Sequence, residues 1–262
     1  MKNISALKDL LSSPKNIVIT THANPDADAL GSSLGLFRYL VGTGHQAIVI
    51  TPTDYANFLT WMPANGEVLV FGERTKNKCY DHINEADLIF CLDFSGLNRI
   101  KDLEDPVRQS SAKKVLIDHH LDPEDFADFQ LWDTGAAATA ELIYDFLEML
   151  DGTDRIDAEI ANCLYAGIMT DTGSFKHPST TAKVHETVAK LIAYGADINY
   201  VNRQIYDTNS VDRLRFIGFA LLEKLVVRPR LKVAYFYINN EDRERFNLKT
   251  GDTEGLVNYA LS

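Results

Sequence analysis

The 262-residue sequence has few cysteines, and they follow no pattern. Cys79, Cys91 and Cys163 are widely spaced and odd in number, which argues against a disulfide framework or a zinc site. We expect three buried thiols. No apolar run approaches the roughly 20 residues of a membrane span, and the first residues lack the apolar core and cleavage site of a signal peptide. These absences predict a cytoplasmic protein that does not enter a membrane.

Basic residues are also in deficit, with 26 Lys and Arg against 37 Asp and Glu, a net charge of −11. Capture of long duplex nucleic acid usually needs a basic face, so we expect no such partner. A phosphate substrate is still open, because bound metal ions bring their own positive charge. The stretch 200–232 is locally basic, with seven basic and three acidic residues. It is either a solvated helix and hairpin surface or a wall of a phosphate-binding cleft.

Aspartate and histidine residues follow directly on apolar runs that we interpret as buried strands. The runs cover 17–19, 88–92, 115–117 and 164–169. In an open α/β sheet the carboxyl ends of parallel strands share one edge, and ligands bind there. We therefore expect these side chains to converge. They are His22, Asp26, Asp28, Asp93, Asp118, His119, His120 and Asp171.

This donor set predicts divalent metal ions, because it combines carboxylate and imidazole groups and contains no thiolate. Six ligands on one ion would leave little room for water and substrate. Shared between two ions about 3.5–4 Å apart, the ligands leave open positions for both. Asp93, at the end of a central strand, is placed to bridge the ions, and His119 and Asp171 complete the second. The mixed ligands favour Mn²⁺, with Mg²⁺, Fe²⁺ or Co²⁺ as alternatives.

Some of these residues have a second interpretation. Asp171 alone could be a helix cap. Asp118 could cap a turn, or it could lie behind the metal ligands and orient an imidazole. His120 faces differently from its neighbour His119, so it is better suited to contact phosphate than to bind metal. The remaining histidines are expected to be solvated, namely His45, His82, His177 and His185.

Short apolar strands alternate with helices, which predicts an α/β fold with a doubly wound, mostly parallel sheet. Beyond the metal-type residues the pattern becomes helical, and then a hairpin opens a smaller α/β C-terminal domain. We expect a catalytic metal-binding domain over 1–180, a helical linker over 181–222 and the beginning of the second domain over 223–262. The helical pattern of 253–262 has no stop signal, so we expect that domain to be incomplete here.

Four segments in this order, HANPDADALGS, LDFSG, IDHH and MTDTGSF, resemble the motifs of the DHH phosphoesterase family. The resemblance covers roughly residues 1–180. It implies that His22, Asp26 and Asp93 hold a first ion. A second ion would be held by Asp28, Asp93, His119 and Asp171, while His120 contacts phosphate.

Within that family the sequence is most similar to the oligoribonuclease and pAp-phosphatase subgroup. The ending EGLVNYALS resembles the start of the DHHA1-type substrate-binding domain, whose GGGH motif is absent from these residues. The resemblance implies a metal-dependent hydrolase of phosphoric esters, in which hydroxide generated between two metal ions attacks short oligonucleotides, linear dinucleotides or pAp. In that reading Asp93, Asp118, His119 and His120 are the catalytic residues.

Other readings of the same sequence stay open. Inorganic pyrophosphatase, cyclic dinucleotide phosphodiesterase and single-strand exonuclease are alternatives within the superfamily. A non-catalytic nucleotide-sensing module is the alternative of another class, and a homodimer is also open. All six ligand positions are filled, which favours an enzyme over the sensing module.

Overall fold

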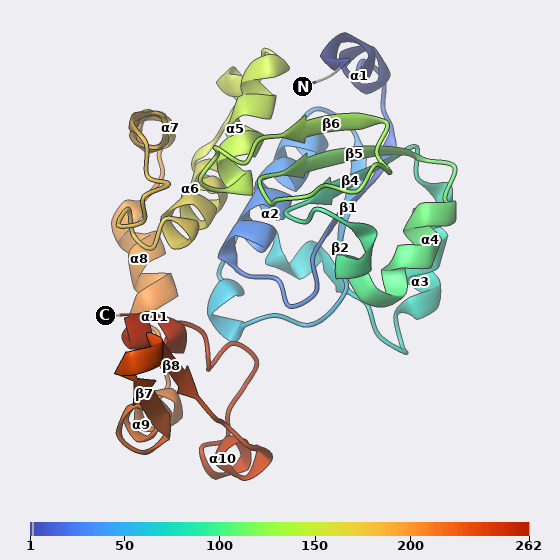
Figure 1. Ribbon diagram of the computed structural model, residues 1–262. Helices are drawn as coiled ribbons and strands as arrows, with labels where there is room; N and C mark the ends of the chain where they lie inside the picture. Colours follow the sequence, from blue (N-terminus) through green and yellow to red (C-terminus); the bar gives the residue numbers. More distant parts are fainter. Residues whose placement is uncertain (2, 262) are drawn as a thin grey trace.

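A computed structural model describes residue 1 and residues 3–261. Its main body is a six-stranded sheet with the order β3-β2-β1-β4-β5-β6, and every pairing recorded in it is parallel (Figure 1). The direction of winding reverses between β1 and β4, so the carboxyl ends of these two strands flank the crevice where doubly wound folds bind ligands. The strands of this sheet are β1 Asn16–Thr21, β2 Gln46–Thr51, β3 Val68–Val70, β4 Leu88–Leu92, β5 Lys113–Asp118 and β6 Phe129–Trp132.

Two helical layers cover the sheet (Figure 1). Alternate side chains of β1 show the division, because Ile17 and Ile19 belong to one apolar cluster and Val18 to another. The first cluster includes α2, α5 and α6, and the second includes α3 and α4. The predicted α/β class and doubly wound sheet are therefore confirmed. The helices of these layers are α2 Ala27–Gly42, α3 Lys76–Glu85, α4 Glu104–Gln109, α5 Thr139–Met149 and α6 Ala158–Asp171.

One predicted strand is wrong. Residues 164–169 lie inside the helix α6 and not in the sheet. The run lacks polar residues because α6 is buried on nearly every side, and a fully buried helix segment has no amphipathic period that would distinguish it from a strand. Gly31 of α2 explains how α6 fits, since a Cβ at this position would collide with the backbone carbonyl of Cys163.

Four helices and strands of the main body were not predicted from the sequence. The helices α1 (Ile4–Leu11), α3 and α4 and the edge strand β6 were not expected. His45, expected to be solvated, is buried at the start of β2. Cys79, Cys91 and Cys163 are free and buried, as predicted. Among the described residues no helix combines the length and apolarity needed to cross a bilayer.

The rest of the chain is helical and then forms a small separate sheet (Figure 1). The helices are α7 Ala182–Ala193, α8 Ile198–Tyr206 and α9 Val211–Phe219, followed by a π-helical turn, Ala220–Lys224. The antiparallel strands β7 Leu225–Arg228 and β8 Val233–Phe236 come next, and then α10 Asn240–Arg245 and α11 Leu256–Leu261. Ser262, the last residue of the expected terminal helix, lies outside the described residues. The domain limits 180/181 and 222/223 stay predictions.

Candidate metal centre

The strand ends bring the predicted residues together at the point where the sheet reverses its winding. His22 follows β1, Asp93 follows β4, and His119 and His120 follow Asp118, the last residue of β5. Aspartates from the starts and ends of helices complete the group. His22, Asp26 and Asp93 form one set whose ligand atoms all lie within 4.8 Å of one another, and Asp28, His119 and Asp171 form a second.

Asp93 belongs to the first set but also faces the second, and it turns one carboxylate oxygen towards the histidine of each. Its Oδ2 is 3.5 Å from Nε2 of His22, and its Oδ1 is 3.5 Å from Nε2 of His119. The residue is 2% exposed and has a φ of 64°. This left-handed backbone costs of order 1–3 kcal/mol for a residue with a side chain, so the surrounding structure must enforce it. The geometry suits a carboxylate that bridges two cations.

The two histidines of these sets are oriented by backbone carbonyls. Nδ1 of His22 lies 2.9 Å from the carbonyl oxygen of Ala23, and Nδ1 of His119 lies 3.3 Å from that of Ala136. Each ring therefore presents Nε2 to the carboxylates. Metal-binding histidines usually donate their second N–H in this way, which fixes the tautomer.

Two aspartates enter the centre from the start of α2. Asp26 is the N-cap, and its Oδ1 accepts hydrogen bonds from the N–H groups of Asp28 and Ala29, each at 3.0 Å. Its Oδ2 is left facing Nε2 of His22 at 3.8 Å. Asp28 is fully buried in the first turn of the helix. The first turn of α2 therefore sends these neighbouring carboxylates to different sets.

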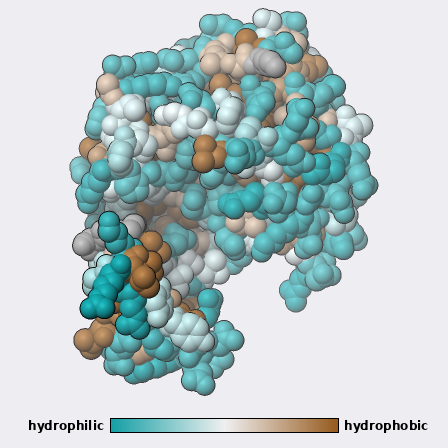
Figure 2. Space-filling model, in the orientation of Figure 1, coloured by the Kyte–Doolittle hydropathy of each residue, from teal (hydrophilic) through white to brown (hydrophobic). Residues whose placement is uncertain are grey.

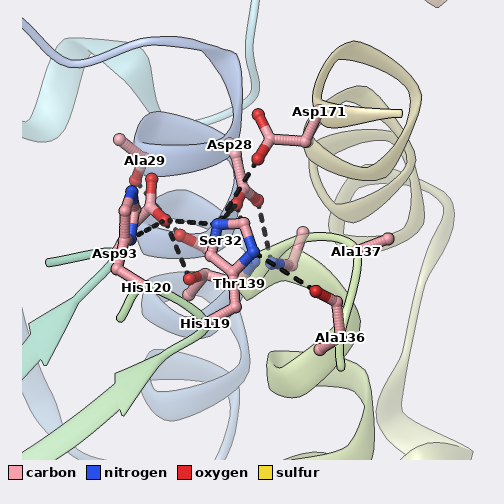
Figure 3. A network of polar contacts seen from close by, with 12 residues as sticks. Asp28, Ala29, Ser32, Asp93, His119, His120, Ala136, Ala137, Thr139 and Asp171 are labelled. Carbon is pink, nitrogen blue, oxygen red and sulfur yellow. Dashed lines mark hydrogen bonds and ion pairs between the residues drawn. The ribbon is translucent and has the colours of Figure 1, made fainter. Parts of the chain in front are cut away.

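Asp28 also reaches a second helix. Its carboxylate accepts hydrogen bonds from the backbone N–H groups of Thr139, at 2.6 Å, and Ala140, at 2.8 Å, in the first turn of α5 (Figure 3). The hydroxyl of Thr139 donates to Oδ1 of Asp93 at 2.9 Å. The sequence analysis missed Thr139. The available signal was Ala138, which occupies the N-cap position and has no side-chain acceptor, so α5 needs a cap from elsewhere.

His120 is oriented by Asp118, and it also forms a third group with Asp93 and His119, whose ligand atoms lie within 4.8 Å of one another. Its Nδ1 lies 2.7 Å from Oδ1 of Asp118 and 3.8 Å from Oδ1 of Asp93. The indole N–H of Trp132 donates to the backbone carbonyl of His120 at 2.7 Å. Asp118 thus orients His120 and not His119, and the sequence analysis did not identify Trp132. This arrangement leaves Nε2 of His120 as the ring atom that can meet a ligand.

Asp171 arrives from the last turn of α6, and not from a strand as expected. Its Oδ2 lies 3.4 Å from Nε2 of His119. Gly167, one turn earlier, allows the close approach of α6, because a Cβ there would lie 2.5 Å from Oδ1 of Asp28.

This arrangement can be compared with known proteins. The family model described as DHH family, N-terminal domain, matches residues 16–168. The chain belongs to the DHH family. The predicted resemblance is confirmed.

Two relatives of this DHH chain from Bacillus subtilis carry enzyme names. The bifunctional oligoribonuclease and PAP phosphatase NrnA of Bacillus subtilis is 28% identical over 245 residues, which cover 92% of this chain and 72% of that protein. The cyclic-di-AMP phosphodiesterase GdpP of the same species is 26% identical over 230 residues, covering 84% and 34%. The predicted enzyme class, a hydrolase acting on phosphoric esters, is confirmed.

A solved structure shows the same fold as this DHH chain. An exopolyphosphatase-related protein from Bacteroides fragilis superposes with a TM-score of 0.93 and is 35% identical, over 99% of this chain and 76% of that one. The agreement extends beyond the residues matched by the family model, so it includes the helices α7 to α9 and the second sheet.

The DHH centre concentrates negative charge. Burial, and then repulsion from Asp26 and Asp93, raises the pKa of Asp171 to about 7. Burial and the charge of Asp93 also raise the pKa of Asp28 and of Asp26. Burial alone would raise the pKa of Asp93, but the two adjacent histidines outweigh it and lower this pKa.

The same concentration of carboxylates raises the pKa values of two histidines. Burial lowers the pKa of His22 and of His119, but Asp93 outweighs it, so that each pKa is raised to about 9. Without another cation, the cluster therefore retains protons. The donor set fits divalent metal ions, because they would replace these protons and neutralise the carboxylates. The oriented Nε2 atoms, and the Asp93 carboxylate with one oxygen towards each histidine, also fit the binding of metal ions.

A cleft of about 1020 Å³ opens on the centre. Asp26 and Asp171 line its side on the main body, and we call this side, together with the metal centre and the helices behind it, the acidic wall. Arg213, Arg243, Lys249 and one carboxylate, Glu254, line its side on the C-terminal part, and we call this side, with the segment from α9 to α11, the basic wall. Figure 2 shows the surface hollowed between these two parts of the molecule. Arg243 and Lys249 lie beyond the stretch 200–232, so the sequence analysis located only part of the basic wall.

Proposed function

We propose that this chain is a metal-dependent phosphoesterase that hydrolyses short oligonucleotides, linear dinucleotides or pAp. The observation that carries the proposal is the position of Asp93, with one carboxylate oxygen facing His22 and the other facing His119. A carboxylate with one oxygen towards each of two ligand sets suits the two ions, about 3.5–4 Å apart, of two-metal hydrolases of phosphate esters.

His22, Asp26 and Asp93 would hold one ion, and Asp28, Asp93, His119 and Asp171 the other. The ions would polarise the phosphoryl group and make a bound water acidic enough to be the nucleophile near neutral pH. Mixed carboxylate and imidazole donors favour Mn²⁺, with Mg²⁺, Fe²⁺ and Co²⁺ as alternatives.

His120 would stabilise charge on the phosphoryl oxygens. Its hydrogen bond to Asp118 raises its pKa, so the ring carries a proton on Nε2 over more of the neutral range. A donor that is fixed before the substrate arrives stabilises developing negative charge without reorganisation. Asp118 would be a positioning residue for this donor.

The cleft supports a substrate larger than a single phosphate group. Its volume of about 1020 Å³ is at the upper end of typical small-molecule sites, of roughly 300–1,000 Å³. Tyr55, Phe58 and Tyr206 line it together with the basic wall, so it offers aromatic surface for a base and cations for a second phosphate. The Bacillus subtilis relative NrnA is named for substrates of this size, oligoribonucleotides and PAP.

The test is hydrolysis by the purified chain with Mn²⁺, offered pAp, pApA, a short RNA, cyclic di-AMP and pyrophosphate separately. We expect turnover of the linear nucleotides, and none after Asp93→Asn. Turnover of cyclic di-AMP or pyrophosphate alone would assign the substrate to those alternatives. Absence of turnover, with nucleotide still bound, would favour the sensing module. A cytoplasmic location and a homodimer stay predictions, which fractionation and light scattering would check.

A further inference from the structure

Thr139 contacts two carboxylates of the centre and is itself fully buried. Its hydroxyl donates to Oδ1 of Asp93 at 2.9 Å, and its backbone N–H donates to Oδ2 of Asp28 at 2.6 Å. Figure 3 shows Thr139 between these side chains at the start of α5. One residue therefore connects Asp93, whose carboxylate faces both sets, to Asp28 of the second set.

The start of α5 explains this position. The first N–H groups of a helix have no partner within the helix, and here the N-cap is Ala138, whose side chain cannot accept a hydrogen bond. Asp28, 111 residues away in the sequence, accepts from Thr139 and Ala140 instead. Because this cap comes from the centre, the first turn of α5 lies against it and brings the hydroxyl of Thr139 to Asp93.

The hydroxyl bonds to a particular oxygen. Asp93 Oδ1 is the atom that faces His119, whereas Oδ2 faces His22. A carboxylate oxygen accepts more than one hydrogen bond or metal contact, so a donor on Oδ1 leaves that atom able to bind an ion. It also resists rotation of the carboxylate, which would exchange or misalign the two oxygens.

We propose that Thr139 is a positioning residue that fixes the carboxylate plane of Asp93, so that one oxygen serves each ion. This inference rests on the proposed function. Loss of the hydroxyl should affect the ion on the Oδ1 side, with His119 and Asp171, more than the ion beside His22. Partners of metal ligands typically contribute 10–100-fold in metal affinity, and we expect about tenfold for the weaker ion.

Two substitutions separate the hydroxyl from the packing of the side chain. Thr139→Val retains the branched shape and removes the donor, whereas Thr139→Ser retains the donor and removes a methyl group. Thr187→Val is the matched control, because Thr187 is a buried threonine in α7, away from the centre. Each variant is titrated calorimetrically with Mn²⁺, and the Mn-loaded forms are compared by electron paramagnetic resonance for coupling between two ions.

We expect Thr139→Val to weaken one of two Mn²⁺ sites about tenfold and to reduce the coupled signal. Thr139→Ser and Thr187→Val should both match the unaltered protein. The melting temperature in chelator shows whether Thr139→Val still folds; if it does not, Thr139→Ala replaces it, with the same expectation. Unchanged binding by the Val variant, or a Ser variant as defective as Val, would overturn the role of Thr139 and leave the proposed function standing. Fewer than two ions on the unaltered protein would overturn the proposed two-metal function itself.

Discussion

The two walls of the cleft are built in different ways. In the acidic wall each predicted ligand is held by a helix start or end, a strand end or a backbone carbonyl, and Asp28 and Asp93 are 0% and 2% exposed. The basic wall surrounds a small apolar cluster of Phe216, Ala220 and Leu256. Large apolar side chains near it are open to solvent, with Leu222 83% and Tyr237 68% exposed.

This difference indicates that the acidic wall serves catalysis and the basic wall serves recognition of the substrate. A rigid, buried set of donors is in place before the substrate arrives, and catalysis requires such preorganised groups. A lightly packed wall can adjust to the far end of different substrates, and motion of such a part commonly accompanies binding. Changes in the acidic wall should therefore reduce turnover, and changes in the basic wall should mainly alter the apparent affinity for longer substrates.

The largest expected effect tests the acidic wall. Asp93→Ala removes the only ligand assigned to both ions, so hydrolysis should fall by about 10³-fold or more, roughly 4 kcal/mol of transition-state stabilisation. Steady-state kinetics measures the loss, and metal analysis of the unaltered protein should approach two ions per chain. A saturating value of one ion, with activity retained, would remove the bridging role.

The histidine pair should divide metal binding from turnover. His119→Ala should lower Mn²⁺ affinity, because Nε2 of His119 faces three carboxylates of the centre. His120→Ala should leave metal bound and slow turnover by about 10²-fold, as expected for one lost transition-state donor. Calorimetric titration of both variants decides between these roles. Equal loss of metal would show that they are misassigned.

The same substitution in the two walls should have opposite signs. Gly167→Ala places a Cβ 2.5 Å from Oδ1 of Asp28 and 2.7 Å from Cβ of Ala140, and overpacking of this kind costs about 1–3 kcal/mol. Gly218→Ala in α9 meets nothing within 4 Å and should gain roughly 0.5–1 kcal/mol from helix propensity. Thermal unfolding of both variants tests the contrast. A stabilised Gly167→Ala variant would mean that α6 can move away from Asp28.

The retained protons predict how metal binding depends on pH. In the metal-free protein the pKa values of His22 and His119 are raised to about 9, so both rings are protonated below that pH and must release protons to bind Mn²⁺. Between about pH 7 and 9 the affinity should rise about tenfold per pH unit for each proton released. Calorimetry in buffers of different ionisation enthalpy counts these protons. A pH-independent affinity with no proton release would contradict the account.

The smallest expected effect tests the basic wall. Arg243 lines the cleft, and its side chain makes no hydrogen bond or ion pair recorded with another described residue. Arg243→Ala should raise KM for a dinucleotide about fivefold, roughly 1 kcal/mol for one exposed phosphate contact. It should leave hydrolysis of bis-p-nitrophenyl phosphate unchanged. Arg230→Ala, an exposed arginine outside the cleft lining, is the control and should behave as unaltered protein.

The sequence predicts the sheet edge well, because His22, Asp93 and His119 each follow directly on an apolar strand. It fails where the information is not local. The run 164–169 is apolar because of burial from several sides, which a strand or a helix can satisfy, so the element before Asp171 was wrongly assigned. The contacts of Thr139 depend on how the first turn of α5 packs against Asp28 and Asp93, and no spacing in the sequence records that packing. Asp118 and His120 are close in the sequence, but the sequence does not show which of the two adjacent histidine rings turns towards this carboxylate.

The capping of α5 by Asp28 has an evolutionary consequence. Asp171 ends its own helix and caps no other, whereas Asp28 also satisfies the first turn of a helix from a distant part of the chain. A lineage that no longer needed catalysis could therefore replace Asp171 with little damage to the fold, but replacing Asp28 would leave buried backbone donors unpaired. We expect inactive descendants of such a chain to lose Asp171 first and to retain Asp28 long after the chemistry has disappeared.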